Sequence, residues 1–119
     1  MEGLRFKLEK SKKIKKKKHF EFLFKNAIKI QNSFLKIYYI KFFDKKRKCA
    51  FIASNYLGNA VKRNTYKRRL REIFRLNQHI ISEEYDFAFI AKNRLLEKNF
   101  DNTNQVFISL LKANNLIKE

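Results

Sequence analysis

Hydrophobic residues near the start of the chain recur at the spacing of a helix. In residues 16–26, Phe20, Leu23 and Phe24 follow the i, i+3, i+4 spacing of one helix face. Most of the other positions in this segment are polar, and several of them are lysine. The pattern predicts a short amphipathic helix.

Two further stretches, residues 27–43 and 48–54, are rich in Ile, Phe and Tyr and predict strands. Alternation within the first stretch assigns its side chains to two faces of a sheet: Leu35, Ile37 and Tyr39 on one, and Lys36, Tyr38 and Ile40 on the other. The polar segment Asp44 to Lys48 predicts a turn between the two stretches.

The last third of the sequence predicts a strand and then a helix. Tyr85 to Ala91 form a continuous apolar run of strand length, which is typical of a buried strand. Asn102 or Thr103 can cap a C-terminal helix. The apolar face of this helix consists of Val106, Phe107, Leu110 and Leu111.

Between these parts lies the most unusual segment, GNAVKRNTYKRRLREIFR, which spans Gly58 to Arg75. Gly58 interrupts the strand pattern, and Asn59 is a plausible N-cap for a helix that extends to about Leu76. The predicted inward stripe of this helix is Val61, Leu70, Ile73 and Phe74. Its basic face consists of Arg63, Lys67 and Arg71 at i, i+4, i+8, with Arg68 and Arg75 beside it.

These elements predict a single α/β (α+β) sandwich, in which helices pack on a small sheet. A chain of 119 residues suits one domain with a modest core. Lys15 to Lys18 are consecutive like charges, so we expect residues 1–18 to form a flexible basic N-terminal tail. This tail either binds a polyanion or is a solvated extension without function. Residues 19–119 then form one folded domain.

A net charge of +18 would destabilise the folded chain by self-repulsion unless an anionic partner neutralises it. Nucleic acid is the first candidate for this partner and an anionic membrane surface is the second. No apolar segment is close to the length of about 20 residues that a membrane-spanning helix requires. We therefore expect no membrane partner, no small-molecule substrate and a cytoplasmic location. The single cysteine, Cys49, excludes an internal disulfide and is expected to be a small buried hydrophobic residue.

The sequence offers few residues for catalysis. His19 and His79 could act as acid and base on a phosphodiester, but both positions favour surface residues. The one acidic cluster, Glu83, Glu84 and Asp86, could hold a metal ion, but a solvated turn explains it better. We therefore expect no catalytic residue and no metal ligand in this chain.

The basic helix is the main indication of function. Seven of the last fourteen residues of Gly58 to Arg75 are Lys or Arg, and Glu72 is the only acid among them. An ordinary exposed helix face mixes both signs of charge, so this pattern favours contact with phosphates. A DNA-binding regulator and a structural or ribosomal-type RNA-binding protein both remain possible on this basis. The DNA-binding regulator is the less favoured of the two, because the sequence lacks the partner helix of a helix-turn-helix.

The same segment resembles the signature of the protein component of bacterial ribonuclease P, approximately G-N-A-V-x-R-N-R-x-K-R-x-x-R-E-x-F-R. The matching residues are Gly58, Asn59, Ala60, Val61, Arg63, Asn64, Lys67, Arg68, Arg71, Glu72, Phe74 and Arg75. Residues 19–26 are similar to the first helix of that family, and Tyr85 to Ala91 to its last strand. The resemblance extends over nearly the whole chain.

The resemblance implies a fold and a function. The order would be αβββαβα, with Ala27 to Ile30 as an extra strand in a small mixed sheet. The strand–helix–strand crossover around the basic helix would be left-handed, against the general right-handed rule. The chain would assist a catalytic RNA that removes the 5′ leader from precursor tRNA, and that RNA would hold the active site and its Mg²⁺.

Two sets of site residues follow from the resemblance. The expected contacts to the catalytic RNA are Arg63, Asn64, Lys67, Arg68, Arg71 and Arg75. The expected contacts to the single-stranded leader are Phe20, Phe24, Lys36, Tyr38, Ala50 and Ile52. Exposed aromatic residues can stack on unpaired bases while a lysine meets phosphate. Judged by spacing alone, Phe20 and Phe24 would instead be core residues.

The sequence also departs from the family pattern. Thr65 replaces the last cation of the R-N-R triplet, and Asn55 and Tyr56 stand where lysines are usual. Arg69 occupies a position that is commonly apolar, and we expect Lys62 and Arg69 to compensate for the missing cation. No contact is carried over at positions 55, 56 and 65.

Overall fold

The structure is a computed structural model that describes residues 17–41 and 47–118. Most of the expected N-terminal tail, and most of the turn predicted at Asp44 to Lys48, lie outside the described residues. The described elements, in chain order, are α1 (Lys17–Asn26), β1 (Ile28–Gln31), β2 (Leu35–Lys41), β3 (Cys49–Ile52), α2 (Ala60–Asn77), β4 (Tyr85–Ala91) and α3 (Phe100–Ala113). Short 3₁₀ turns, η3 (Asn55–Leu57) and η4 (Asn93–Glu97), precede α2 and α3. The order αβββαβα is confirmed.

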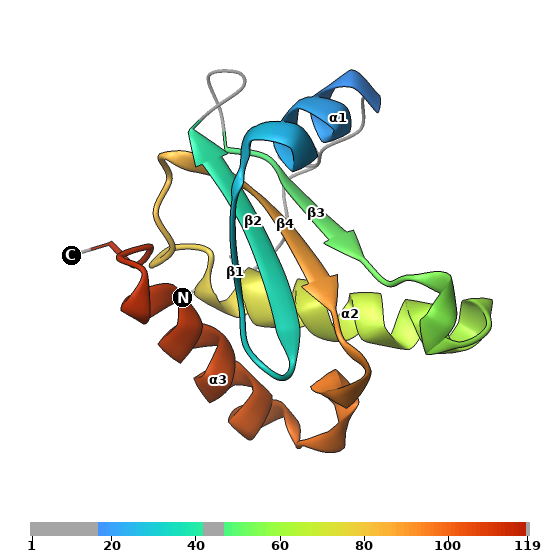
Figure 1. The fold of residues 1–119 in the computed structure, drawn as a ribbon. Coiled ribbons are helices and arrows are strands. Elements are labelled where there is room, and N and C mark those ends of the chain that lie inside the picture. Colours follow the sequence, from blue (N-terminus) through green and yellow to red (C-terminus); the bar gives the residue numbers. More distant parts are fainter. Residues whose placement is uncertain (1–16, 42–46, 119) are drawn as a thin grey trace.

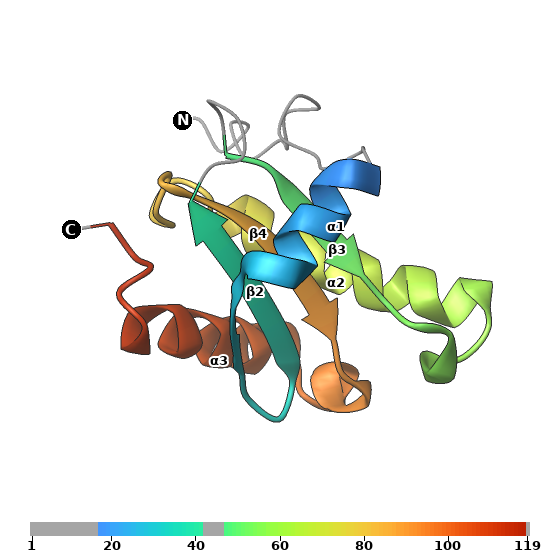
Figure 2. The ribbon, with the colours of Figure 1, turned by 45° about the horizontal axis from the view of Figure 1, so that its top comes forward.

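The four strands form one mixed sheet in the order β1-β2-β4-β3. Neighbouring strands are antiparallel except for β3 and β4, which run parallel. Helix α1 covers one face of the sheet, and α2 and α3 cover the other (Figures 1 and 2). Helix α2 connects the parallel strands β3 and β4, and it passes behind the sheet in the view of Figure 1. This strand–helix–strand crossover is left-handed, as the resemblance implied.

Alternation along the strands divides the side chains between the two faces. Leu35, Ile37 and Tyr39 of β2 are buried toward α2 and α3, whereas Lys36, Tyr38 and Ile40 are half-buried on the side of α1. Large aromatic residues fill the first side, and the buried rings of Phe74, Phe87, Phe89 and Phe107 are among them. Cys49 is buried in the same cluster, as predicted. The main core therefore lies between the sheet and the pair α2 and α3.

The cluster under α1 is much smaller. Its buried hydrophobic members are Leu23, Ala50 and Ala88, with a rim of partly buried residues. The two alanines allow the single leucine of α1 to approach the sheet closely. Hydrophobic burial consequently holds α1 far less strongly than it holds α2.

The basic helix begins as predicted and buries a partly different stripe. Asn59 is the N-cap, and its side chain accepts a hydrogen bond from the Lys62 backbone N–H. Leu70, Ile73 and Phe74 are buried, but the prediction for Val61 is wrong, since it is 76% exposed. At about 100° per residue, Val61 lies half a turn away from Leu70. Tyr66 is buried instead and donates its hydroxyl to the carbonyl of Asn93.

The C-terminal helix begins earlier than predicted. Its N-cap is Asn99, whose side chain accepts from the backbone N–H of Asn102. Asn102 and Thr103 are therefore inside the helix, and the buried Thr103 hydroxyl donates to the Asn99 carbonyl. Of the predicted apolar face, Phe107 and Leu111 are buried and Val106 and Leu110 are half-buried.

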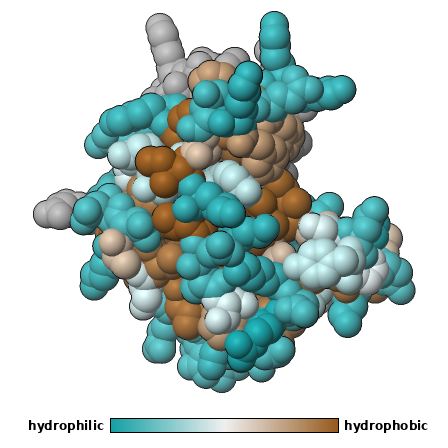
Figure 3. Space-filling view, viewed as in Figure 1, coloured by the Kyte–Doolittle hydropathy of each residue, from teal (hydrophilic) through white to brown (hydrophobic). Residues whose placement is uncertain are grey.

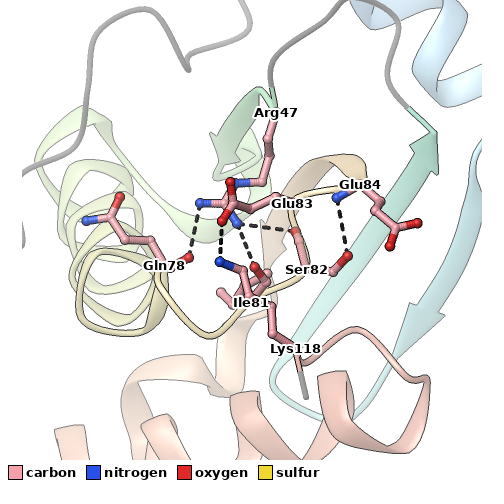
Figure 4. A network of polar contacts seen from close by, with 7 residues as sticks. All are labelled: Arg47, Gln78, Ile81, Ser82, Glu83, Glu84 and Lys118. Atoms are coloured by element: carbon pink, nitrogen blue, oxygen red, sulfur yellow. Dashed lines mark hydrogen bonds and ion pairs between the residues drawn. The ribbon is translucent and has the colours of Figure 1, made fainter.

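Arg47, in the segment predicted to be a polar turn, is buried, since its side chain is only 4% exposed. Figure 4 shows its guanidinium beside the end of α2, where it donates to the carbonyls of Gln78 (3.1 Å), Ile81 (2.9 Å) and Ser82 (3.2 Å). It also lies over the Phe74 ring, 5.2 Å from the centroid. Gln78 is the C-cap of α2, and Ile81 and Ser82 belong to the segment that follows it. Arg47 thus supplies donors and positive charge to the C-terminus of α2 and ties it to the chain that leads to β4.

Replacing Arg47 with Ala should destabilise the fold by about 2–4 kcal/mol, because three carbonyls lose a buried donor. Urea denaturation measures this as a lower midpoint with an unchanged slope. Arg94→Ala is the matched control, since Arg94 forms an exposed ion pair with Glu97 and should lose less than about 1 kcal/mol. Equal midpoints for the two variants would contradict the capping role.

Candidate nucleic-acid interface

The outer face of α2 presents a groove lined by basic and polar side chains. Val61, Asn64, Thr65, Arg68 and Arg71 surround a volume of about 390 Å³. Asn64, Arg68 and Arg71 are exposed. A guanidinium and an amide side by side provide the donors that phosphates and base edges accept.

Two other predicted contacts, Arg63 and Lys67, are half-buried on the same helix. Arg63 donates to the carbonyl of Gly58 (3.0 Å), so part of its hydrogen-bonding capacity holds the turn before the helix. Gly58 has a φ of +132°, and a side chain there would meet that of Lys62 at 3.0 Å. A glycine is therefore required at this turn.

Charge is distributed unevenly along α2. Arg75 forms a two-pronged pair with Glu72, with Nη2 2.6 Å from Oε1 and Nε 3.2 Å from Oε2. The hydrogen bond from Arg75 lowers the pKa of the Glu72 carboxyl, so the pair is charged at neutral pH. Within the described residues, Arg63, Lys67, Arg68 and Arg71 form no ion pair with an acid. The positive charge available to a ligand is thus concentrated on the first three turns of the helix.

The expectation that Arg69 strengthens this basic face is wrong. Its guanidinium donates to the Lys98 carbonyl (3.2 Å) and to the Thr103 hydroxyl (3.1 Å), and it lies over the Phe100 ring. Arg69 therefore links α2 to the start of α3. Lys62 is exposed at the beginning of α2 and remains able to contribute.

The other predicted surface lies on the opposite face of the sheet, beneath α1. The strand register puts Tyr38 opposite Ala88, and Ala88 opposite Ala50, in one row across the sheet. The next row is Lys36, Ile90 and Ile52. All four predicted strand residues therefore share one face.

The phenylalanines of α1 complete this surface. Phe24 contacts Tyr38 edge to face, with ring centroids 5.0 Å apart, and stacks with Phe20 at 6.2 Å. Phe24 is 41% exposed, so the alternative from spacing alone, that it is a core residue, does not hold. Phe20 is half-buried at the rim of the small cluster. The six predicted residues are thus brought together by α1, β2 and β3.

Their accessibility differs in a way that the sequence did not reveal. Leu23 of α1 packs over Ala50 and Ala88, and Ala50 forms a buried floor with little surface for a ligand. The row of Lys36, Ile90 and Ile52 is half-exposed instead. Figure 3 shows hydrophobic side chains among hydrophilic ones on this face, over the sheet below α1. We name this surface, formed by Phe20, Phe24, Lys36, Tyr38, Ile52 and Ile90, the aromatic cleft.

Ile90 is the member of the aromatic cleft that sequence reasoning missed. It sits between Lys36 and Ile52 because β4 lies between β2 and β3. Alternation within Tyr85 to Ala91 assigns Asp86, Ala88 and Ile90 to one face, but only the strand order shows which face.

The chain was compared with known protein families, proteins and structures. Residues 8–114 match the family model described as Ribonuclease P.

The chain belongs to the ribonuclease P protein family.

Its curated relatives include the ribonuclease P protein components of Caldanaerobacter subterraneus subsp. tengcongensis and Petrotoga mobilis. The first is 31% identical, over 93% of this chain and 96% of the relative. The second is 41% identical, over 84% and 82%. Among solved structures, the RNase P protein of Thermotoga maritima is 26% identical and has a TM-score of 0.75, over 85% of this chain and 96% of that one.

The sequence-based expectation that both histidines lie at the surface holds for only one of them. His79 is exposed, as predicted. The prediction for His19 is wrong, because only 3% of it is exposed and its Nε2 lies 2.8 Å from Asp86 Oδ2. Asp86 is likewise buried rather than part of a solvated turn. Its location follows from alternation in β4, which turns it toward α1.

The other two acids of the predicted turn are exposed and pair with lysines. Glu84 binds Lys41 at 2.8 Å, and Glu83 binds Lys118. Among residues 17–41 and 47–118, no group of three or more His, Cys, Asp or Glu side chains could hold a metal ion. In the same part of the chain, no helix has the length and apolar character needed to cross a membrane.

Glu72→Gln should strengthen binding of a ribonuclease P RNA by about threefold, because it releases the Arg75 guanidinium and removes a negative charge from α2. Filter binding at two salt concentrations measures the change. Glu97→Gln is the matched control, since Glu97 also pairs with an arginine three residues away, Arg94, but outside α2. The same gain for both variants would show an effect of net charge alone.

Proposed function

We propose that this chain is the protein partner of a catalytic RNA in the cytoplasm, and that their complex removes the 5′ leader of precursor tRNA by Mg²⁺-dependent hydrolysis. Membership of the ribonuclease P protein family supports the assignment. The observation that carries it is the presence of two surfaces suited to RNA on opposite faces of one sheet. One is a basic helix and the other is an aromatic cleft.

We assign the chemistry of the reaction to the RNA. The carboxylates near the strands and helix ends are paired individually with basic side chains: Glu72 with Arg75, Glu83 with Lys118, Glu84 with Lys41, Asp86 with His19 and Glu97 with Arg94. Dispersed and already paired, these carboxylates do not fit a shared Mg²⁺ ion. The RNA would therefore hold the Mg²⁺ and its active site.

The basic helix suits the catalytic RNA. Arg63, Lys67, Arg68 and Arg71 present positive charge on a rigid element, so their alignment with phosphates costs little conformational entropy. Each phosphate that they neutralise releases counterions. Asn64 adds an exposed amide between them. A-form RNA does not admit a helix into its major groove, so the target would be an irregular junction or a folded core.

The aromatic cleft suits the single-stranded leader. Unpaired bases expose faces that stack on aromatic rings, at about 1–3 kcal/mol for each base. Phe24 and Tyr38 provide such rings, and the Lys36 ammonium lies in the next row of the sheet, where it can meet phosphate. This chemistry needs no base-specific hydrogen bond, so the cleft would accept leaders of different sequence.

The direct test is cleavage of a precursor tRNA with a 5′ extension by cognate catalytic RNA at low Mg²⁺, with and without this protein. We expect the protein to restore cleavage and to be inactive alone, because it adds substrate affinity and screens RNA charge. Tight RNA binding without any effect on cleavage would favour a structural RNA-binding protein. Cleavage by the protein alone would contradict the assignment of the chemistry to RNA.

Single substitutions should separate the two surfaces. Arg68→Ala should weaken assembly with the catalytic RNA and reduce the slope of log K against log salt by about one, because one phosphate contact is lost. Lys112→Ala, an exposed cation on α3, is the control and should leave both quantities unchanged.

Tyr38→Ala should leave assembly unchanged and reduce the preference for leader-bearing tRNA over mature tRNA. Loss of one stacking partner predicts a decrease of about tenfold in that preference. Binding of the two tRNAs to the assembled complex measures it. If Arg68→Ala and Tyr38→Ala impair the same step, the division into two surfaces is wrong.

A further inference from the structure

A buried polar pair connects α1 to the middle of the sheet. His19 Nε2 lies 2.8 Å from Asp86 Oδ2, and the two side chains are 3% and 0% exposed. The other carboxylate oxygen, Oδ1, accepts a hydrogen bond from the backbone N–H of Lys48 at 2.9 Å. One carboxylate of β4 therefore contacts both α1 and the chain that enters β3.

Such a pair is costly to bury, so its presence calls for an explanation other than stability. Two apolar residues of the same volume would often hold a helix to a sheet equally well. They would not, however, specify one orientation, because hydrophobic contact has no direction. A hydrogen bond to a buried carboxylate does have direction, and it constrains both the position and the rotation of α1.

Rotation of α1 matters because of the order of its side chains. His19 and Leu23 are four residues apart and form the stripe that faces the sheet. Phe20 and Phe24 each follow one residue later, about 100° around the helix, which turns them toward the aromatic cleft. A small rotation of α1 would therefore move both rings relative to Tyr38.

Hydrophobic packing alone constrains this rotation weakly. Leu23 is the only fully buried apolar side chain of α1, and it rests on two alanines. The large core on the other side of the sheet contains no residue of α1. The docking of α1 is thus separable from the stability of the remaining domain.

We propose that the His19–Asp86 pair is a positioning device for leader recognition. It fixes the rotation of α1, holds Phe24 against Tyr38 and so keeps the aromatic cleft formed before the leader arrives. Neither side chain contacts RNA in this role. The inference rests on the proposed function, because the leader is the ligand whose binding the pair assists.

The test uses His19→Ala, Asp86→Asn and the double variant, with Glu21→Ala as the control. Glu21 is an exposed residue of α1 that pairs only loosely with Lys17, at 4.0 Å. Hydrogen exchange of the protein compares the amides of α1 with those of α2. Binding of precursor and mature tRNA to the complex with catalytic RNA measures leader preference in the same variants.

We expect His19→Ala to speed exchange of the α1 amides by about tenfold, the size typical of losing a buried hydrogen bond, and to leave the α2 amides unchanged. Leader preference should fall by about threefold or more, because the cleft is formed for a smaller fraction of the time. Assembly with the catalytic RNA should not change. The double variant should be no worse than His19→Ala, because an asparagine at position 86 keeps an oxygen that can accept from the Lys48 N–H, and both changes then remove the same contact with α1. Glu21→Ala should behave like the parent.

Three results would overturn the inference. Unchanged exchange in α1 would show that the pair does not hold the helix. An equal increase in α1 and α2 would show that it merely supports the whole fold. Faster exchange in α1 with full leader preference would show that the cleft does not depend on it, provided that Tyr38→Ala lowers that preference. If Tyr38→Ala has no effect either, the proposed leader site itself fails, and the exchange data alone decide whether the pair positions α1.

Discussion

The division of side chains along β4 is the constraint on which the other features depend. This strand pairs with both β2 and β3, so its side chains lie near the centre of each face of the sheet. Phe87 and Phe89 point toward α2 and α3, and they form the centre of the main core. Asp86, Ala88 and Ile90 face the other way. Asp86 pairs with His19 of α1, Ala88 packs beneath Leu23, and Ile90 forms part of the aromatic cleft. One strand thus provides a large apolar side for stability and a small, mixed side that we propose serves binding.

This division explains why the two helical layers differ in character. On the core side, α2 buries Leu70, Ile73 and Phe74 and is thereby held rigidly with its basic groove outward. Arg47 binds the carbonyl of Gln78 at the end of the same helix and two carbonyls of the segment that follows. On the other side, small residues allow α1 to lie close to the sheet without covering all of it. A rigid basic helix and a partly covered sheet are the two surfaces of this architecture that we propose bind RNA.

Charge follows the same organisation. A net charge of +18 repels itself, yet most acids in the described ranges are paired with cations away from the first turns of α2. Neutralisation therefore occurs at strand ends and loops, and the groove around Asn64 and Arg68 keeps its charge. The energy of that repulsion is recovered when a polyanion binds, which makes binding sensitive to salt.

Local patterns predicted much of the fold because they depend on neighbours only a few residues apart. Alternation of period two identified β2, and a continuous apolar run identified β4. The sequence after Gly58 located the start of α2 within one residue. The error at Val61 is also local, because helix geometry alone turns this residue half a turn away from Leu70. The contact of Arg69 with Thr103 is not local, since it joins residues of two helices that are 34 positions apart.

The sequence by itself determined the types and order of the elements, the two-faced strands and the surplus of positive charge, because each arises from local spacing or composition. It also carried the motif that indicated the family. Only the tertiary structure decided which residues meet across the sheet, since this depends on β4 lying between β2 and β3. That strand order inserted Ile90 into the cleft and brought Asp86 to His19, 67 positions away. No local pattern encodes such a contact, because partners so distant in sequence are brought together only when the whole sheet has formed.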